Sequence, residues 1–350
     1  MSHTQYFEVD CLIDAASAIF VGAGVAPVDA RIVAANLVES EARGVPSHGL
    51  MLLPMYLDRL RDGSVIATGR GEVVSDQGAV SVLDAGHRLG QVTGVWAMEL
   101  AIGKARSFGL GAVAVRNAFH FGGAFSYAVQ AANQGMIGIA AANTRPLMPA
   151  PGGAKAVVGN NPLAFAVPQS GGSPIVLDMA LSEAALGKIR LAAAEGREIP
   201  PTWASDVFGV PTTDPSAALA GLLLPMGGPK GYGLALIVDL LTGALSGGGF
   251  GQGVRGLYAD TAVPNNAAHF FLALDPSRFS VGFDERAKEL ASEIKASPTA
   301  PGVDCVFLPG EIEDQRAQAA RTNGIRLEAT VFHTLLASAK RVGVTTMLPV

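Results

Sequence analysis

The sequence predicts an α/β protein in which a helical block precedes a mixed sheet. Residues 6–61 place apolar side chains at helical spacing and show little strand character. After residue 70, short runs rich in valine and alanine alternate with helical stretches, as expected of an α/β layer. The 350 residues are 49% hydrophobic and 16% charged, which is an ordinary globular composition.

Three helices are expected in the first block, over residues 6–21, 27–41 and 49–61. Pro27 suits the first turn of the second helix, and Gly44-Val45-Pro46 ends it. Ser47 is expected to cap the third helix, and Asp62-Gly63 to end it.

Strands and helices then alternate without an internal repeat. Strands are expected at residues 72–75, 80–84, 111–115, 136–142, 163–167, 175–178 and 268–274. Helices are expected at residues 93–107, 124–133, 182–194, 229–245, 284–296, 311–323 and 327–340. Residues 198–215 are rich in proline and turn residues, and weak boundaries fall near Ala118 and Pro298.

Charge and cysteine content exclude several classes of function. The net charge of −5 favours neither nucleic acid nor an anionic membrane as a partner. Cys11 and Cys305 are the two cysteines, and their separation indicates a reducing compartment without a disulfide framework. Residues 1–8 lack a signal-peptide core, and Asp239 breaks the longest apolar run. A cytoplasmic protein is therefore expected.

Several common catalytic motifs are also missing from the sequence. The histidines at positions 3, 48, 87, 120, 269 and 333 have no zinc-binding spacing, so no metal site is expected. The letters G-x-G-x-x-A at residues 109–114 follow a helix and enter a strand, which reverses the dinucleotide-binding arrangement. Any NAD(P) site must therefore differ from the ordinary Rossmann turn.

A glycine-rich turn at residues 227–233 is the better candidate for binding an anion. It directly precedes a long helix, whose free N–H groups favour negative charge. Lys230 adds a cation there, so a phosphate or a substrate anion fits. The alternative is a loop that only packs closely against the sheet.

Two histidines are candidates for acid/base chemistry. Ser47-His48-Gly49 lies before an expected helix, and His120 follows an expected strand. Reduction of a 2-oxo acid needs a proton donor, the reverse reaction needs a base, and histidine titrates near neutral pH. The alternatives are a loop or capping role for His48, and packing of His120 between Phe119 and Phe121.

Polar residues follow two further strands, where α/β sheets usually bind ligands. Arg145 is placed to bind a carboxylate through two parallel hydrogen bonds, or else is a surface residue of a turn. Asp178 is placed to hold a ribose hydroxyl or to orient a histidine, or else caps the helix expected near Ser182.

Taken in order, several short motifs resemble those of the malate/L-lactate dehydrogenase family. They are S-H-G at 47–49, L-P-x-Y at 53–56, H-F-G at 120–122, G-N-N-P at 159–162, L-D-M-A at 177–180, P-T-T-D-P at 211–215 and K-G-Y-G at 230–233. The family includes ureidoglycolate and sulfolactate dehydrogenases, diketogulonate reductase and piperideine/pyrroline-2-carboxylate reductases. The resemblance covers residues 10–340.

The resemblance implies a non-Rossmann α/β fold, like that of L-sulfolactate dehydrogenase, that binds NAD or NADP as a homodimer. It implies one unit of residues 1–118 plus 298–350 for dimerisation and substrate, and an NAD(P)-binding unit of residues 119–297. His48 or His120 would be the acid/base, and Ser47, Tyr56 and Arg145 would face the substrate. The implied cofactor contacts are Thr144, Asp178, Met179, Ala180, Lys230, Gly231, Pro309, Gly310 and Glu311.

One position departs from the family pattern. Relatives commonly read S-H-G-x-x-R, and the arginine position is Leu52 here. The change removes the guanidinium donors and predicts an apolar wall, which disfavours malate. Either Arg145 holds the carboxylate alone, or the substrate carries a more apolar group on that side. We expect an NAD(P)H-dependent oxidoreductase that reduces a small 2-oxo acid or a cyclic 2-imino acid. The alternative is a catalytically silent homologue that binds a nicotinamide cofactor.

Overall fold

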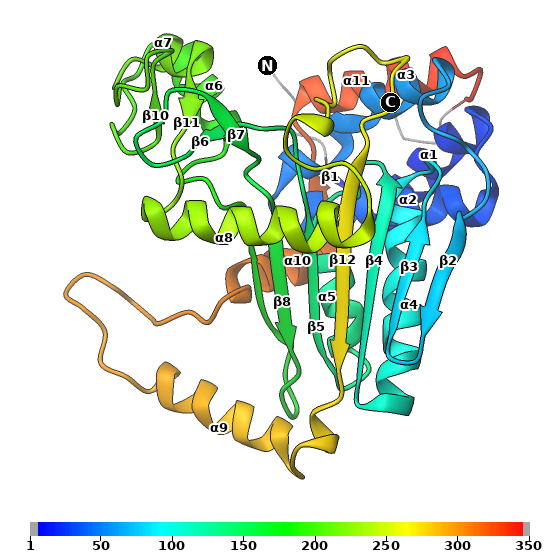
Figure 1. The fold of residues 1–350 in the computed structure, drawn as a ribbon, viewed down its shortest axis with the longest axis vertical. Coiled ribbons are helices and arrows are strands. Elements are labelled where there is room, and N and C mark those ends of the chain that lie inside the picture. Colours follow the sequence, from blue (N-terminus) through cyan, green and yellow to red (C-terminus); the bar gives the residue numbers. More distant parts are fainter. Residues whose placement is uncertain (1–5, 346–350) are drawn as a thin grey trace.

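A seven-stranded mixed sheet forms the centre of the computed structural model, which describes residues 6–345 (Figure 1). Its strands, in spatial order, are β2 (Glu72–Gln77), β3 (Val80–Asp84), β4 (Leu110–Ala118), β12 (Ala267–Leu274), β5 (Ile137–Ala142), β8 (Leu163–Val167) and β9 (Ile175–Met179). The predicted α/β class is confirmed. The sheet takes strands from both sides of residue 118, and so from both expected units. Residues 1–5 and 346–350, which belong to the first expected unit, lie outside the described residues.

Strand direction brings three chain segments to one edge of the sheet. β12 runs antiparallel to both β4 and β5, so β4 and β5 are parallel to each other. β8 is antiparallel to β5, and β9 is antiparallel to β8, so β9 shares their direction. The segments that follow β4, β5 and β9 therefore leave the same edge, which we call the carboxyl edge.

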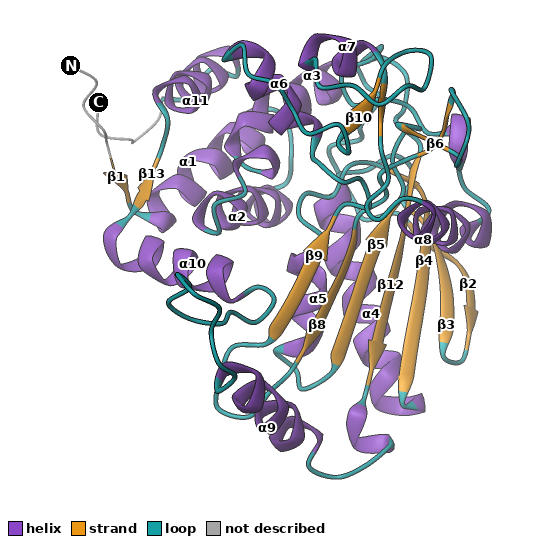
Figure 2. Cartoon of the chain, turned by 90° about the vertical axis from the view of Figure 1, so that its left-hand side faces the viewer, coloured by secondary structure: helices purple, strands orange, loops and turns teal. Residues whose placement is uncertain are grey.

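Helices cover both faces of the sheet (Figure 2). On one face lie α4 (Gly90–Phe108) and α5 (Phe125–Ala132), and on the other lies α8 (Pro229–Asp239), which continues as a π-helical turn over Leu240–Ala244. Successive strand residues point to opposite faces, so Phe271 packs with the α4 and α5 side chains and Phe270 with those of α8. A Cβ at Gly111 would lie 2.0 Å from the Ala101 oxygen, so only glycine allows β4 to approach α4 this closely.

A smaller lobe lies beside the start of α8 (Figure 1). It contains α6 (Leu186–Ala194), α7 (Pro215–Ala220) and the strand pairs β6–β7 (Met148–Pro149 with Ala156–Val158) and β10–β11 (Ala204–Ser205 with Leu222–Leu223). The expected helix from residue 182 begins only at Leu186, because Ser182 bridges to Pro225 and turns the chain.

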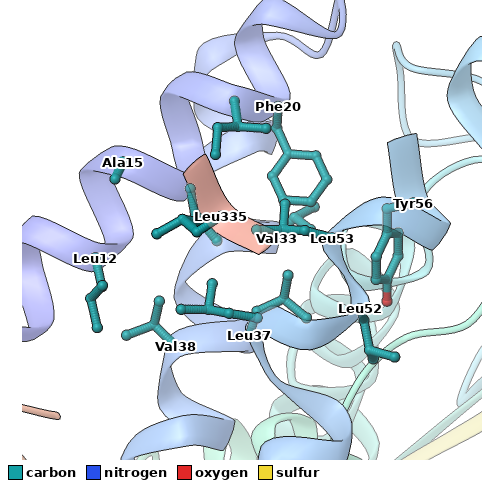
Figure 3. Packing of buried hydrophobic residues seen from close by; sticks show 14 of the residues in the cluster. Leu12, Ala15, Phe20, Val33, Leu37, Val38, Leu52, Leu53, Tyr56 and Leu335 are labelled. Atoms are coloured by element: carbon teal, nitrogen blue, oxygen red, sulfur yellow. The ribbon is translucent and has the colours of Figure 1, made fainter. Parts of the chain in front are cut away.

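The N-terminal helical block lies toward the carboxyl edge (Figure 1). Its helices are α1 (Val9–Gly22), α2 (Pro27–Ala42), α3 (Leu53–Arg61) and the C-terminal α11 (Ala329–Arg341). They share one apolar core, in which Leu12, Phe20, Leu37 and Leu335 are fully buried (Figure 3). Burial of each such side chain contributes roughly 1.5–3 kcal/mol to folding.

The remaining elements lie at the ends of this body. α10 (Glu311–Asn323) packs against α2, α9 (Phe283–Lys295) precedes it, and β1 (Tyr6–Phe7) pairs with β13 (Ile325–Arg326). The expectation of a helix from residue 6 was therefore wrong at its start. The chain is in strand form there because it pairs with β13.

The third expected helix also begins later than residue 49. Two 3₁₀ turns, Pro46–His48 and Leu50–Leu52, precede α3. Pro54 then occupies the first turn of α3, where its missing N–H breaks no helical hydrogen bond. Ser47 lies inside a turn and does not cap a helix.

Candidate active site

Two imidazoles meet at the carboxyl edge. His48 comes from the first 3₁₀ turn, and His120 follows the end of β4. Their ring centroids lie 5.7 Å apart with an interplanar angle of 24°. The two histidines singled out in the sequence are thus brought together by the fold.

Burial keeps both imidazoles neutral at physiological pH. It lowers the pKa of His120 to about 3, and repulsion from the protonated forms of His48 and His269 also disfavours a charge on His120. Burial also lowers the pKa of His48. His269, on β12, stacks on Phe121 with 4.4 Å between ring centroids, and burial lowers its pKa to about 3 as well.

Tyr56 contacts His120 directly and does not line an open pocket. Its hydroxyl lies 2.8 Å from His120 Nδ1, and its side chain has no exposed surface. The ring packs edge-on against Phe20 and Phe119, which fixes its position. The amide of Gln91, from α4, donates a hydrogen bond to the same hydroxyl. Tyr56, which was expected to face the substrate, thus contacts the imidazole in this structure.

Glu41 supports the turn that carries His48. Its Oε1 accepts a hydrogen bond of 2.8 Å from the Leu50 N–H. A Cβ at Gly49 would lie 2.3 Å from this oxygen, so the close approach requires glycine. Burial raises the pKa of Glu41 to about 7, the Leu50 bond opposes this, and Glu328 adds to it. In the sequence Glu41 looked like an ordinary polar residue at a helix end.

Leu52 belongs to the helical core. It is 4% exposed and lies with Tyr56 at one edge of the apolar cluster (Figure 3). The apolar pocket wall expected at this position is therefore wrong, because the side chain packs among the helices.

Hydrogen bonds fix the backbone that carries Arg145 after β5. The Asn143 amide donates to Asp239 Oδ1 at 2.9 Å and to the Gly249 oxygen at 2.8 Å. The Thr144 N–H donates to Asn161 Oδ1 at 2.9 Å. In the sequence, Asp239 stood out only as a single carboxylate inside an otherwise apolar helix. The Arg145 side chain itself stays exposed.

A cavity of about 460 Å³ adjoins Arg145. Arg255, Gln252 and Asp260 also line it, so its lining includes two arginines and one aspartate. Neither His48 nor His120 is among the residues that line this cavity.

Arg59 links the cavity wall to the imidazoles. It is fully buried on α3, and its guanidinium donates to backbone oxygens of the 256–263 segment that lines the cavity. The same group lies 5.9 Å from the ring centroid of Phe119, the neighbour of His120. Sequence reasoning missed Arg59, because a charged residue in a short helix is usually exposed.

The candidate cofactor residues form two neighbouring groups. Along β9, the Val176 N–H donates to the Pro309 oxygen at 3.0 Å, which sets the 309–311 segment beside the start of the strand, whereas Asp178, Met179 and Ala180 follow at its carboxyl end. At the start of α8, Lys230 is exposed and follows Gly227 and Gly228, whose φ values are 58° and 65°. The Met226 N–H donates to the Leu181 oxygen and joins the two groups.

Asp178 caps a helix, but not the one the sequence suggested. Its Oδ2 accepts a hydrogen bond of 2.9 Å from the N–H of Phe125, the first residue of α5. Although the residue keeps exposed surface, protein atoms around its carboxyl group raise its pKa to about 6, against the effect of the Phe125 bond.

A second cavity, of about 710 Å³, lies beside the start of β9, at the end of the strand away from the carboxyl edge. Pro309 and Glu311 line it together with Lys288 and Lys295.

Among residues 6–345, no group of three or more histidine, cysteine, aspartate or glutamate side chains is placed to hold a metal ion. Within the same residues, no helix is both long and apolar enough to cross a membrane.

Comparison with known proteins identifies the class and the family. Relatives are named dehydrogenases and reductases, among them NAD(+)- and NADP(+)-specific ones, so the class is an NAD(P)-dependent oxidoreductase. The sequence pattern of the malate/L-lactate dehydrogenase family matches residues 7–336, and the chain belongs to that family. The resemblance seen in the short motifs is thus confirmed.

Individual relatives cover nearly the whole chain. A malate dehydrogenase of Pyrococcus abyssi is 38% identical over 326 residues, which are 90% of this chain and 89% of that one. The structure of sulfolactate dehydrogenase from Methanocaldococcus jannaschii matches with a TM-score of 0.91 and 36% identity, covering 98% of each chain. That of Δ1-piperideine-2-carboxylate reductase from Pseudomonas syringae pvar. tomato matches with a TM-score of 0.87 and 31% identity, covering 96% of this chain and 100% of that one.

The raised pKa of Glu41 predicts a pH-dependent stability change. A carboxyl pKa that rises from 4.5 to about 7 on folding lowers stability as the pH rises between these values. Glu41→Gln keeps an oxygen that accepts the Leu50 N–H but carries no charge. We expect the free energy of unfolding of the variant to exceed that of wild type by up to about 3 kcal/mol near pH 8 and to equal it near pH 4.

Urea unfolding at both pH values measures this difference. Glu39→Gln, on the same helix, removes ion pairs with Arg43 and Arg321 and should gain no stability near pH 8. An equal effect of Glu41→Gln at the two pH values would contradict the assignment.

Proposed function

We propose that the protein interconverts a small 2-hydroxy acid and the corresponding 2-oxo acid, with the imidazole pair handling the proton. The observation that supports this most is the stacking of His48 and His120, 5.7 Å apart, at the edge where β4 and β5 end. In the oxidative direction one neutral imidazole can accept the hydroxyl proton while the other donates a hydrogen bond to the same oxygen. In the reductive direction the first imidazole must take up a proton from solvent and then pass it to the new hydroxyl oxygen.

The residues present fit a nicotinamide cofactor, which when bound accepts or supplies the hydride. Gly227 and Gly228 adopt left-handed φ values directly before α8, so the backbone can approach a phosphate at the helix start. Lys230 adds a cation on the first turn. The second group, along β9, would extend this contact toward Pro309 and Glu311.

Arg145 and Arg255 favour a substrate with two anionic groups. In a substrate that reaches from the imidazoles into this cavity, one guanidinium would bind the carboxylate and the other a second acidic group. Malate and sulfolactate, named for two of the relatives, are of this kind. The argument against malate rested on Leu52, which lies in the helical core.

A cyclic 2-imino acid is the second candidate substrate. The likeness to a piperideine-carboxylate reductase supports it, since that structure aligns with 96% of this chain. The same imidazole pair would then exchange a proton and form a hydrogen bond with the imine nitrogen in place of the carbonyl oxygen. A silent cofactor-binding homologue remains the alternative in which no substrate is turned over.

A homodimer and a cytoplasmic location complete the proposal. An apolar stripe runs along α8 and the π-helical turn, exposed at Leu236, Ile237, Leu240, Leu241 and Leu245. Such a contiguous apolar surface is typical of an interface.

Cys11 and Cys305 are exposed and form no disulfide, as expected in a reducing compartment.

Loss of either imidazole should abolish most of the activity. His48→Ala and His120→Ala are each expected to lower kcat by roughly 10²-fold or more, because a proton-transfer or orienting group is removed. Reduced-cofactor absorbance, followed with oxaloacetate, pyruvate and a cyclic imino acid, measures this. The exposed His333→Ala serves as control. Wild type that binds the cofactor but oxidises it with no member of a wider acid and imine panel would establish the silent alternative.

Arg255 should discriminate between singly and doubly charged substrates. Arg255→Ala is expected to raise KM for oxaloacetate by roughly tenfold or more, since one charge-assisted contact is lost, and to leave KM for pyruvate nearly unchanged. Arg70→Ala removes an exposed arginine outside the cavity and is the matched control. Equal changes in both KM values would refute a second anion site.

The apolar stripe should hold two copies of the chain together. Light scattering is expected to give twice the monomer mass for wild type, and Ile237→Asp to give the monomer, because burying a carboxylate in an apolar interface is costly. A monomeric wild type would exclude the dimer.

A further inference from the structure

Gln91 places an amide next to Tyr56 that the proposed proton transfer does not use. It is the second residue of α4, and its side chain has no exposed surface. Its Nε2 donates to the Tyr56 hydroxyl, while its Oε1 has no partner among the described residues. An unpaired buried acceptor costs roughly 1–3 kcal/mol. An apolar side chain of similar size would fill the space without this cost, so packing alone does not account for the amide.

The hydrogen bonds run in one direction from Gln91 to His120. Because the Tyr56 oxygen accepts from Gln91, its one hydroxyl hydrogen is free for His120 Nδ1, 2.8 Å away. A nitrogen that accepts this hydrogen carries none of its own. The neutral imidazole then holds its hydrogen on Nε2, on the side of the ring away from Tyr56.

Unpaired groups disfavour the opposite direction. If Gln91 Oε1 accepted from Tyr56, the Nε2 amide would be left with two buried N–H groups and no partner. Buried N–H groups without partners are rarer than carbonyl oxygens without partners. Burial also raises the pKa of Tyr56 above its usual range, so the hydroxyl keeps a hydrogen to donate.

We propose that Gln91 is a positioning residue that fixes, through Tyr56, the Nε2–H tautomer of His120. In the proposed function, on which this consequence rests, Nε2–H donates a hydrogen bond to the reacting oxygen. His48 is then the group that accepts or returns the proton. The tautomer itself depends only on the Gln91–Tyr56–His120 chain of contacts.

Nitrogen-15 spectra of the imidazoles in the full-length protein test this without substrate or cofactor. For wild type near pH 7 we expect the His120 Nε2 resonance at the protonated position and the Nδ1 resonance at the unprotonated one. In Gln91→Met the Tyr56 hydroxyl is free to donate or accept, so both resonances should move toward intermediate values. Gln91→Leu provides a second shape in case methionine disturbs packing. Thr93→Val, another buried polar residue of α4 that bonds only to its own helix, should leave the spectrum unchanged.

A hydrogen on Nδ1 in wild type, or full retention of the Nε2–H tautomer in both Gln91 variants, would overturn the proposal. Where the enzyme turns over, Gln91→Met should also lower kcat by roughly tenfold with little change in KM, since it alters orientation and not binding. If wild type shows no activity with any substrate, only the proposed function is refuted. The tautomer proposal is unaffected, because the spectra report the tautomer independently of turnover.

Discussion

The antiparallel placement of β12 between β4 and β5 is the constraint on which the site depends. Because β12 separates them, β4 and β5 run parallel, and the segments that follow them leave one edge with His120 and Arg145. The loop that leads into β12 reaches the same edge and brings Arg255. A direct antiparallel pairing of β4 with β5 would have placed His120 and Arg145 at opposite ends of the sheet.

α3 then fixes two parts of this edge relative to each other. Tyr56 and Arg59 lie one turn apart and are both fully buried. Tyr56 holds His120, and Arg59 binds carbonyl oxygens of the cavity wall. A buried guanidinium is tolerated only where its donors are bonded, which the backbone oxygens ensure here. Because one helix provides both contacts, the wall and the imidazole keep a fixed relative position.

Half-buried neutral imidazoles and exposed cations are separate groups in the site. Burial keeps the imidazoles uncharged, so they are suited to proton transfer and hydrogen bonding. Arg145, Arg255 and Lys230 keep exposed side chains, where their charges persist and are available to anions. Proton chemistry and recognition of charge are thus assigned to different depths of the same edge.

The sequence by itself determined the elements whose periodicity is strong. The predicted bounds of β3, β8 and α10 are those of the structure, because glycine or proline lies close to both ends of each. Glycine-rich surroundings also singled out His48 and His120. Local pattern carries this information, since a strand or helix is specified by its own residues.

Only the tertiary structure decided what the polar residues of the helices do. Glu41, Arg59 and Gln91 look like solvent-exposed residues in one dimension, and their partners lie on other elements. Sequence analysis likewise placed Leu52 in a pocket wall, and the structure buries it in the helical core. The physical reason is that burial and hydrogen-bond partners depend on which elements pack together, and spacing along a single segment does not contain that information.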